Sequence, residues 1–277
     1  MSQTWIYNIP LPEGAEIDSF SDHFNWLEIE GLEENETNIA VYVHEDNTEA
    51  FEAHLNRLIE ELSISFTKYL MEEKNWNETW EKSFQPVKIN QLVGIRASFH
   101  EPFEDVKFDI VIDPKMSFGT GHHATTMQVM EMMERIEILD KKILDLGSGT
   151  GILAILAEKM GAKEVLAIDN DPWCYENNLE NNLLNNIQKV TPLLGSLEDV
   201  IQEQFDIVFA NIQRNYLLEN MGGLATVLKE RGQLIISGFL PQDAQDLLNA
   251  ALEHHLIAQY HTTFNNWDCI LLEKHTL

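Results

Sequence analysis

A carboxylate and a cluster of glycines stand at the spacing that a nucleoside-binding site requires. The segment 142–157 reads as a buried strand, a tight turn and a helix, and the turn contains Gly147, Gly149 and Gly151. Glycines in such a turn let backbone N–H groups approach a ligand closely, and the helix that follows offers its positive N-terminal end. Asp169 ends the next apolar run, where its carboxylate can accept hydrogen bonds from ribose hydroxyls.

The spacing of the glycines distinguishes between kinds of nucleoside ligand. A dinucleotide fingerprint is Gly-x-Gly-x-x-Gly/Ala, whose second glycine makes room for a pyrophosphate. This chain has Gly-x-Gly-x-Gly, with Ile152 in the place of the third small residue, which disfavours a pyrophosphate. Together with Asp145, the pattern Asp-x-Gly-x-Gly-x-Gly resembles motif I of the S-adenosylmethionine-dependent methyltransferases. On this motif alone, a dinucleotide enzyme and a chance strand-turn-helix are the alternatives.

Two further segments should reach the same edge of the sheet. The loop 113–126 is rich in glycine, histidine and threonine and leads into a methionine-rich helix. Its hydroxyls and N–H groups could bind the carboxylate or the amine of an amino-acid tail. Asn211 follows the apolar run Phe205–Phe209. An amide at that place can accept a hydrogen bond from an incoming amine and direct its lone pair.

Together these segments resemble the family of methyltransferases that modify large-subunit ribosomal protein L11. The family pattern is a Phe-Gly-Thr-Gly-x-His-x-Thr-Thr loop, a glycine-rich motif I, Asp-x-Asp-Pro and Ala-Asn-Ile. The matching segments are Phe118–Thr126, Asp145–Ile155, Asp169–Pro172 and Ala210–Ile212, in the family's order and at similar separations. Motif I is shared by many methyltransferases, whereas the loop combined with Ala-Asn-Ile is much more specific. The resemblance covers residues 70 to 277.

The resemblance implies a cofactor, a reaction and a set of site residues. The cofactor would be S-adenosylmethionine, and the contacting residues would be Thr126, Gly147, Asp169 and Asn211, with Gly149 and Phe118 nearby. Asn211 would also face the substrate amine as the catalytic residue. The reaction would be protein N-methylation of lysine ε-amines, the N-terminal α-amine or both in ribosomal protein L11. The alternatives are methylation of another protein or of a small-molecule amine, and a binding module that holds the cofactor without turnover.

The histidines offer two further hypotheses. His123 is either a general base for the amine or a residue that fixes the loop, and the second role is favoured. The pairs His122–His123 and His254–His255 are weak candidates for metal ligands, so the sequence predicts no metal site.

Charge and composition limit the partners and the compartment. The formal net charge of −28 repels nucleic acid and attracts basic proteins. This effect extends over roughly one Debye length, about 8 Å at physiological salt. Acidity that serves only solubility is the alternative. An 18-residue apolar run and a secretory signal are both missing, which indicates no membrane span and a cytoplasmic protein. Cys174 and Cys269 predict neither a disulfide framework nor a zinc site. The oligomeric state is not predicted.

The chain is predicted to contain two domains and a connector. Residues 1–72 show strands and a helix, and the resemblance implies a ferredoxin-like substrate-recognition domain of the α+β class. The expected elements are strands at Trp5–Ile9, Ile39–Val43 and Ser65–Met71 and a helix at Thr48–Leu62. Residues 73–92 form a connector in which Trp76 and Trp80 lie one helical turn apart and pack between the domains. Residues 93–277 form the cofactor-binding domain.

Strands and helices alternate through the second domain, which predicts a parallel, doubly wound sheet. Three strands come first, at Pro86–Ile89, Gly94–Phe99 and Phe108–Ile112. The alternating elements are a helix at 125–136, a strand to Leu146, a helix to Met160, a strand at 164–168, a helix at Pro172–Asn185 and a strand at Phe205–Phe209. The runs Leu256–Phe264 and Asp268–Glu273 must pair antiparallel because they are so close in sequence. With the resemblance, this predicts an α/β fold with a mostly parallel seven-stranded methyltransferase sheet and an antiparallel last strand.

Overall fold

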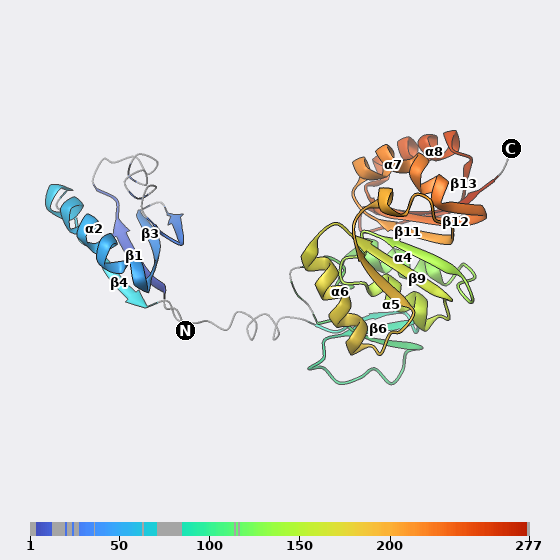
Figure 1. Ribbon diagram of the computed structural model, residues 1–277, viewed down its shortest axis with the longest axis horizontal. Helices are drawn as coiled ribbons and strands as arrows, with labels where there is room; N and C mark the ends of the chain where they lie inside the picture. Colours follow the sequence, from blue (N-terminus) through green and yellow to red (C-terminus); the bar gives the residue numbers. More distant parts are fainter. Residues whose placement is uncertain are drawn as a thin grey trace. The chain divides into compact units, whose positions relative to one another are not determined.

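A computed structural model of the chain describes residues 4–12, 20, 24, 28–35, 37–62, 64–70, 85–113, 115 and 117–275. The chain divides into two compact units, Met1–Glu81 and Lys82–Leu277 (Figure 1). The predicted connector, 73–92, spans this boundary. Its expected helix with Trp76 and Trp80 lies outside the described residues.

The first unit is built on a four-stranded antiparallel sheet. The strands are β1 (Thr4–Pro10), β2 (Gly31–Glu34), β3 (Asn38–His44) and β4 (Thr67–Leu70), in the order β2-β3-β1-β4. The helix α2 (Thr48–Leu62) lies between β3 and β4 in the sequence. This strand order is the one that a ferredoxin-like unit has. The sequence predicted β1, β3, β4 and α2 but missed the short strand β2.

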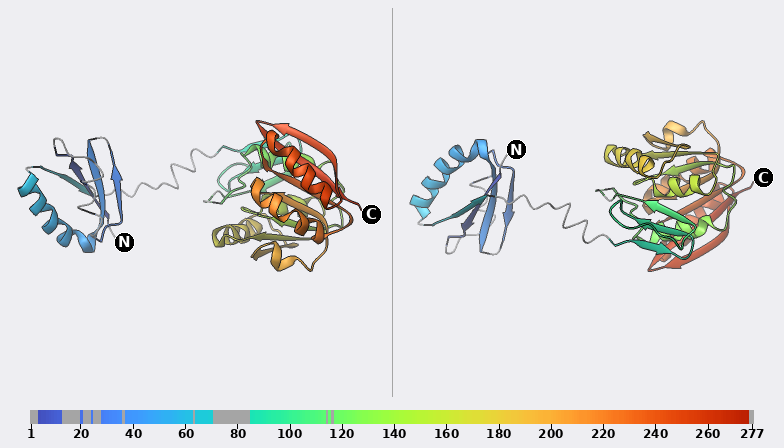
Figure 2. Two further views of the ribbon diagram at one scale, coloured as in Figure 1. Left: turned by 90° about the horizontal axis from the view of Figure 1, so that it is seen from above. Right: turned by 90° about the horizontal axis from the view of Figure 1, so that it is seen from below.

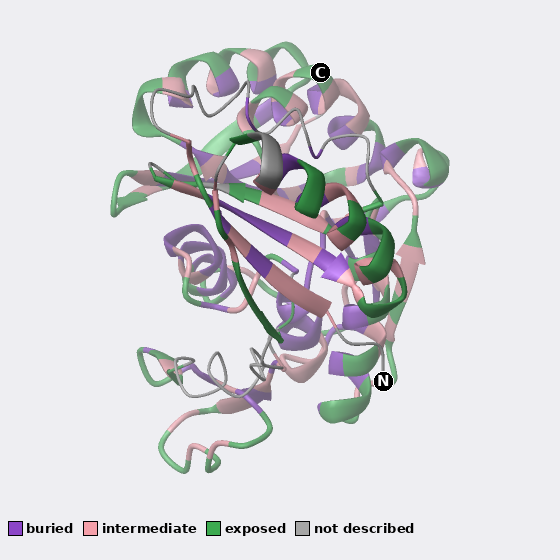
Figure 3. Ribbon diagram, turned by 90° about the vertical axis from the view of Figure 1, so that its left-hand side faces the viewer, coloured by how far each residue is buried: buried purple, intermediate pink, exposed green. Residues whose placement is uncertain are grey.

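One face of this sheet is covered and the other is not. Side chains along a strand alternate between the two faces, so Tyr7 and Ile9 of β1 point the same way, and both are fully buried. Figure 3 shows this alternation as buried and less buried bands along the strands. Phe51 and Leu55 of α2, one helical turn apart, join them in a single core. On the opposite face, no described helix covers the sheet.

The second unit contains the predicted seven-stranded sheet. Its order is β10-β9-β8-β11-β12-β14-β13, and β14 runs antiparallel to both of its neighbours while the other pairs are parallel. The strands are β8 (Lys142–Leu146), β9 (Glu164–Asp169), β10 (Val190–Leu194), β11 (Phe205–Asn211), β12 (Leu228–Phe239), β13 (Leu256–Phe264) and β14 (Trp267–Lys274). The predicted fold class is confirmed.

Helices cover both faces of this sheet (Figure 2). They are α4 (Ala124–Met133), α5 (Ile152–Lys159), α6 (Pro172–Leu184), α7 (Arg214–Val227) and α8 (Ala244–Glu253). Alternation along β8 divides the core: Ile143 packs with α4 and α5, whereas Leu144 and Leu146 pack with α7 and α8. The inner strands, such as β8 and β11, are therefore buried on both sides, and their polar backbone is accessible mainly at the strand ends, whereas most residues of the edge strand β13 are exposed.

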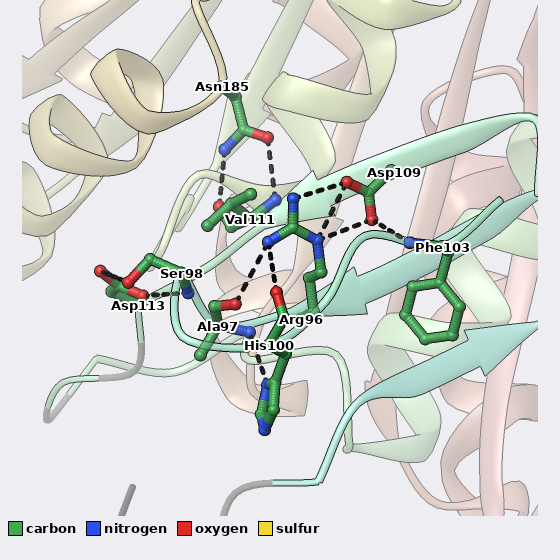
Figure 4. Close-up of polar contacts among 9 residues, drawn as sticks. All are labelled: Arg96, Ala97, Ser98, His100, Phe103, Asp109, Val111, Asp113 and Asn185. Atoms are coloured by element: carbon green, nitrogen blue, oxygen red, sulfur yellow. Dashed lines mark hydrogen bonds and ion pairs between the residues drawn. The ribbon is translucent and has the colours of Figure 1, made fainter.

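A small three-stranded sheet packs on the same side as α5. It consists of β5 (Val87–Ile89), β6 (Val93–Arg96) and β7 (Phe108–Val111) in the order β5-β6-β7. The strand predicted to reach Phe99 ends at Arg96, because the N–H of Ala97 donates to the His100 ring at 3.2 Å and begins a turn (Figure 4). Arg96 Nε donates to both carboxylate oxygens of Asp109, at 3.0 and 3.1 Å, and fixes this turn against β7.

No described helix is long and apolar enough to cross a membrane.

Candidate functional site

A cavity of about 550 Å³ opens where β8, β9 and β11 end. The strand order reverses between β8 and β11, and crevices for ligands form at such points in parallel sheets. Five of the six residues predicted for the site line this cavity: Phe118, Gly147, Gly149, Asp169 and Asn211. They come from four separate stretches of the sequence, which the sheet brings together.

The glycine turn between β8 and α5 has a backbone that other residues rarely adopt. Gly147 has φ +70°, and a Cβ added there would lie 2.4 Å from the Ile212 side chain. A glycine is therefore required for the turn to pass beneath the end of β11. The turn brings Gly147 and Gly149 to the cavity wall, where the lack of side chains leaves room for a ligand to lie against the backbone.

Asp169 is held rigidly at the tip of β9. Its Oδ2 accepts a hydrogen bond from the N–H of Gly149 at 2.8 Å, and its Oδ1 accepts one from the N–H of Asp171 at 3.0 Å. Each carboxylate oxygen can accept a second hydrogen bond. Asp169 therefore keeps the capacity to accept from two neighbouring hydroxyls, as a ribose would offer.

Asn211 supplies an acceptor that has no partner. Its Nδ2 donates to Thr126 Oγ1 at 3.4 Å, while its Oδ1 is buried and makes no hydrogen bond to any described residue. A buried acceptor left without a donor costs about 1–3 kcal/mol. Because Asn211 also lines the cavity, a ligand N–H or O–H is the natural donor to this oxygen.

Thr126 differs from the prediction in its position. It is 1% exposed and does not line the cavity, whereas its neighbour Thr125 does. Consecutive residues of a helix point about 100° apart, so the register of α4 turns Thr125 toward the cavity and Thr126 toward Asn211. The structure thus places Thr126 behind the cavity wall, where it holds the Asn211 amide.

Three aromatic rings lie in a row along one wall. The ring centroids of Phe118 and His123 are 5.3 Å apart, and those of His123 and Trp267 are 4.9 Å apart. His123 is the N-cap of α4, and its Nδ1 accepts from the N–H of Thr125. Because this cap occupies Nδ1, the geometry favours the loop-fixing role of His123 over the role of a base.

A second carboxyl group lies beneath the glycine turn. Asp145 is 1% exposed, and its Oδ2 accepts from the N–H of Ala154 at 3.2 Å. Burial is the main cause that raises the pKa of Asp145 from 3.8 to about 7; the hydrogen bond from Ala154 opposes the rise, and the charge of Asp169 adds to it. Burial and the charge of Asp169 also raise the pKa of the Cys174 thiol at the cavity wall.

Several lining residues had no clear signal in the sequence. Gly195 and Ser196 reach the cavity because they follow β10, a strand that the sequence did not predict. Tyr216 comes from α7, which was also missed. The pattern Leu-Leu-Gly-Ser after an apolar run could have indicated another strand end at the same edge.

Metal ligation finds no support in the described part of the chain, where no three His, Cys, Asp or Glu side chains gather at a possible metal site. His122 Nε2 instead lies 2.8 Å from the backbone oxygen of Gln85.

Comparison with known proteins identifies relatives over most of the chain. The sequence pattern of the family described as ribosomal protein L11 methyltransferase (PrmA) matches residues 14–275. The ribosomal protein L11 methyltransferase of Porphyromonas gingivalis is 35% identical over 257 residues, which cover 90% of this chain and 88% of the relative. The protein of the same name from Bacteroides fragilis is 36% identical over 246 residues, covering 87% of this chain and 88% of the relative.

A solved structure supports the same relationship. The ribosomal protein L11 methylase of Lactobacillus delbrueckii subsp. bulgaricus superposes with a TM-score of 0.64 at 28% identity. The match covers 70% of this chain and all of that structure's chain.

Proposed function

Because this chain belongs to the ribosomal protein L11 methyltransferase family, we propose that it transfers methyl groups from S-adenosylmethionine to amines of ribosomal protein L11. The acceptors are lysine ε-amines, the N-terminal α-amine or both. The observation that carries the proposal is the buried, unpartnered Oδ1 of Asn211 in a cavity that also contains the glycine turn and Asp169.

The residues of the cavity fit this donor. Asp169 keeps two lone pairs for ribose hydroxyls, and Gly147 and Gly149, which have no side chains, leave room for a ligand that approaches the backbone closely. Ile152 begins α5 where a dinucleotide site has a small residue. We assign the binding of S-adenosylmethionine to Gly147, Gly149, Asp169 and Phe118, with Thr126 acting through Asn211. When bound, S-adenosylmethionine supplies an electrophilic methyl group on a sulfonium.

The catalytic role of Asn211 is orientation. Thr126 Oγ1 accepts from the amide nitrogen, which leaves the amide oxygen to accept an N–H of the incoming amine. That hydrogen bond turns the lone pair of the amine toward the methyl group. Correct positioning of two reactants can supply about 7–11 kcal/mol of a barrier. Asn211 therefore contributes to this positioning without giving or taking a proton.

The amine must be neutral before it attacks. A lysine amine has a reference pKa of about 10.4 and an α-amine one near 8. The Nδ1 of His123 is occupied in capping α4. We therefore assign water as the acceptor of the proton that the amine loses. The reaction rate should accordingly rise with pH through the neutral range.

We assign recognition of the protein substrate to the first unit. Residues 1–81 contain nineteen Asp and Glu but only three Lys and Arg, a formal charge of −16. The longer second unit carries the remaining −12 of the total of −28. A basic ribosomal protein would be attracted chiefly to the first unit.

The open face of the first sheet is the surface that we assign to this contact. Strand register places Tyr42, Ile6 and Tyr69 side by side in one row across β3, β1 and β4. Tyr69 is 49% exposed, and Tyr42 donates to Glu33 Oε2 at 3.0 Å beside the row. An apolar row with carboxylates at its border suits a basic protein that also presents apolar side chains.

Net charge also selects the form of the substrate. A charge of −28 is repelled by ribosomal RNA, so the free protein is the substrate and direct nucleic-acid contact is disfavoured. We place the reaction in the cytoplasm, where ribosomal proteins are made.

Incubation with tritiated S-adenosylmethionine and separately purified ribosomal proteins tests the proposal. We expect label on ribosomal protein L11, less label on assembled subunits, and much slower labelling of ribosomal protein L11 with the Asn211→Ala variant. Label on a different protein or only on a small amine would replace the substrate assignment. Donor binding in calorimetry without transfer to any basic protein would indicate a binding module and contradict the proposed activity.

A further inference from the structure

Thr150 lies within the glycine turn, yet its side chain serves a different segment. It is fully buried and is not among the residues that line the cavity. Its Oγ1 donates to the backbone oxygen of Gly119 at 2.6 Å, and its N–H donates to the backbone oxygen of Phe118 at 2.9 Å. Both acceptors belong to residues 117–123, which we call the Phe118 loop.

The turn and the Phe118 loop are in direct backbone contact. A Cβ added to Gly149 would lie 2.3 Å from the backbone oxygen of Phe118, and one added to Gly119 would lie 3.0 Å from Thr150 Oγ1. Gly119 also has φ +96°, which other residues rarely adopt. The two segments can approach this closely only because both positions are glycine.

Thr150 is also held by a residue of α6. Asn181 is fully buried, and its Nδ2 donates to the backbone oxygen of Thr150 at 2.9 Å. Its Oδ1 accepts from the N–H of Asp113 at 3.2 Å, just before the Phe118 loop. One asparagine therefore fixes both the turn that holds the loop and the backbone that leads into it.

We propose that the Thr150 hydroxyl is a positioning group that latches the Phe118 loop to the glycine turn before any ligand binds. The loop carries Phe118 and His123, two of the aromatic rings of the cavity wall. Thr150 touches no ligand and acts through the position of these rings. A latched loop gives the donor a preformed wall, so the donor does not have to order the loop when it binds.

The closest isosteric change tests the hydroxyl alone. Thr150→Val keeps the branched shape but removes the donor to Gly119, whereas Thr150→Ser keeps the donor. Ser148→Ala is the matched control, because Ser148 is a buried hydroxyl in the same turn that accepts from Asn178 and, among the described residues, makes no hydrogen bond to the loop.

The first readout is amide hydrogen exchange of residues 117–121 in the ligand-free protein. We expect Thr150→Val to accelerate exchange roughly three- to tenfold, and Thr150→Ser and Ser148→Ala to leave it within about twofold of the wild type. This result does not depend on the proposed function. Unchanged exchange in Thr150→Val, or equal acceleration in Ser148→Ala, would overturn the latch.

The second readout is the affinity for S-adenosylmethionine by calorimetry, which rests on the proposed function. We expect roughly three- to tenfold weaker binding in Thr150→Val, rescue in Thr150→Ser, and less than twofold further loss when Thr150→Val is added to Phe118→Ala. Additive losses in the double variant would show that Thr150 does not act through Phe118. A wild type that fails to bind the donor would refute the proposed function and leave the exchange result standing.

A general loss of structure is distinguished by the melting temperature. A positioning role leaves the melting temperature of Thr150→Val close to that of Ser148→Ala. A fall confined to Thr150→Val, with exchange accelerated across all of β8 to β11, would make Thr150 a purely structural residue and overturn the proposal.

Discussion

The two larger sheets of this protein, one in each unit, differ in how many of their faces are covered. The inner strands of the seven-stranded sheet are buried on both faces, so their accessible polar groups gather at the strand ends, where the cavity lies. The sheet of the first unit is covered on one face by α2, and its other face is open in the described residues. A doubly covered sheet suits chemistry at an edge, whereas an open face suits contact with another protein.

Charge follows the same division. The first unit carries −16 in 81 residues, and the second carries −12 in more than twice that length. The second unit also buries a carboxyl group, Asp145, whereas the first keeps Glu52 at its surface, paired with Lys68 at 2.5 Å. Changes in each unit should therefore affect different measured quantities.

The largest expected effect concerns the buried carboxyl group of the second unit. The pKa of Asp145 is raised to about 7, so the folded state holds its proton more tightly than the unfolded state does. The stability that this provides is complete at low pH and is lost as the pH rises toward 7. The free energy of unfolding of Asp145→Asn, minus that of the wild type, should increase on the order of 3 kcal/mol from pH 5 to pH 8.

Denaturant-dependent hydrogen exchange measures this for each unit separately. Amides of β8 and β9 should show the gain in Asp145→Asn. Amides of β1 and β3 should not, since burial and the hydrogen bond to Glu52 raise the pKa of Tyr7 to about 12 and keep it neutral in this range. If the difference in the free energy of unfolding between variant and wild type stays the same from pH 5 to pH 8, Asp145 is ionised when buried.

Asn211→Ala should have the next largest effect and should act on catalysis alone. Loss of the orienting amide oxygen should lower kcat on the order of 100-fold, because misplaced reactants lose the advantage of proximity. The KM for the protein substrate should stay within about twofold, since the docking surface is in the other unit. Steady-state kinetics with a melting curve measures both, and a fall in the melting temperature together with a raised KM would contradict the separation of roles.

Tyr69→Ala should show the opposite behaviour. Removing the exposed ring from the row with Ile6 and Tyr42 should raise the KM for the protein substrate about tenfold and leave kcat unchanged. Leu252→Ala is the matched control, because Leu252 is 61% exposed on α8 of the second unit. An equal rise in KM for both variants would place the docking surface elsewhere.

Salt should produce the smallest change. Screening of the acidic first unit should lower kcat/KM for the free protein substrate roughly fivefold between low salt and 0.5 M salt. The value of kcat at saturating substrate should not change. A parallel fall in kcat would mean that salt acts on the chemistry and not on the encounter.

Local patterns were sufficient to predict the core of the second unit. The strands β8, β9 and β11 are mostly apolar; the glycine turn follows β8 directly, and Asp169 ends β9. The position of Asn211 also followed from the sequence, because a residue just after a parallel strand must lie at the ligand-binding edge. These features could be predicted because they depend on the residue pattern of single strands and on the rule that ligands bind at the carboxyl ends of parallel strands.

The missed elements are those whose local signal is weak. Pro192 interrupts β10, which an edge strand tolerates because one of its sides has no ladder partner. Adjacent glycines, Gly222 and Gly223, weaken the helical pattern of α7. The approach of Trp267 to the cavity wall depends on the insertion of β14 between β12 and β13, a long-range pairing that no local pattern reveals.

The finding that Thr125 lines the cavity in place of the predicted Thr126 has a different cause. Both residues match the pattern of the loop, and the sequence could not decide which of them faces the cavity. The start of α4 at Ala124 fixes that direction, and the bounds of a helix are uncertain by one or two residues in any sequence-based prediction.

The burial of both thiols has a practical consequence for measuring motion between the units. Cys269 is fully enclosed, Cys174 is 9% exposed, and burial raises the pKa of each thiol, so neither is readily alkylated. A maleimide dye would therefore react selectively with a cysteine introduced on the surface. One such cysteine in each unit would carry a dye, and energy transfer between the two dyes would report the distance between the two units.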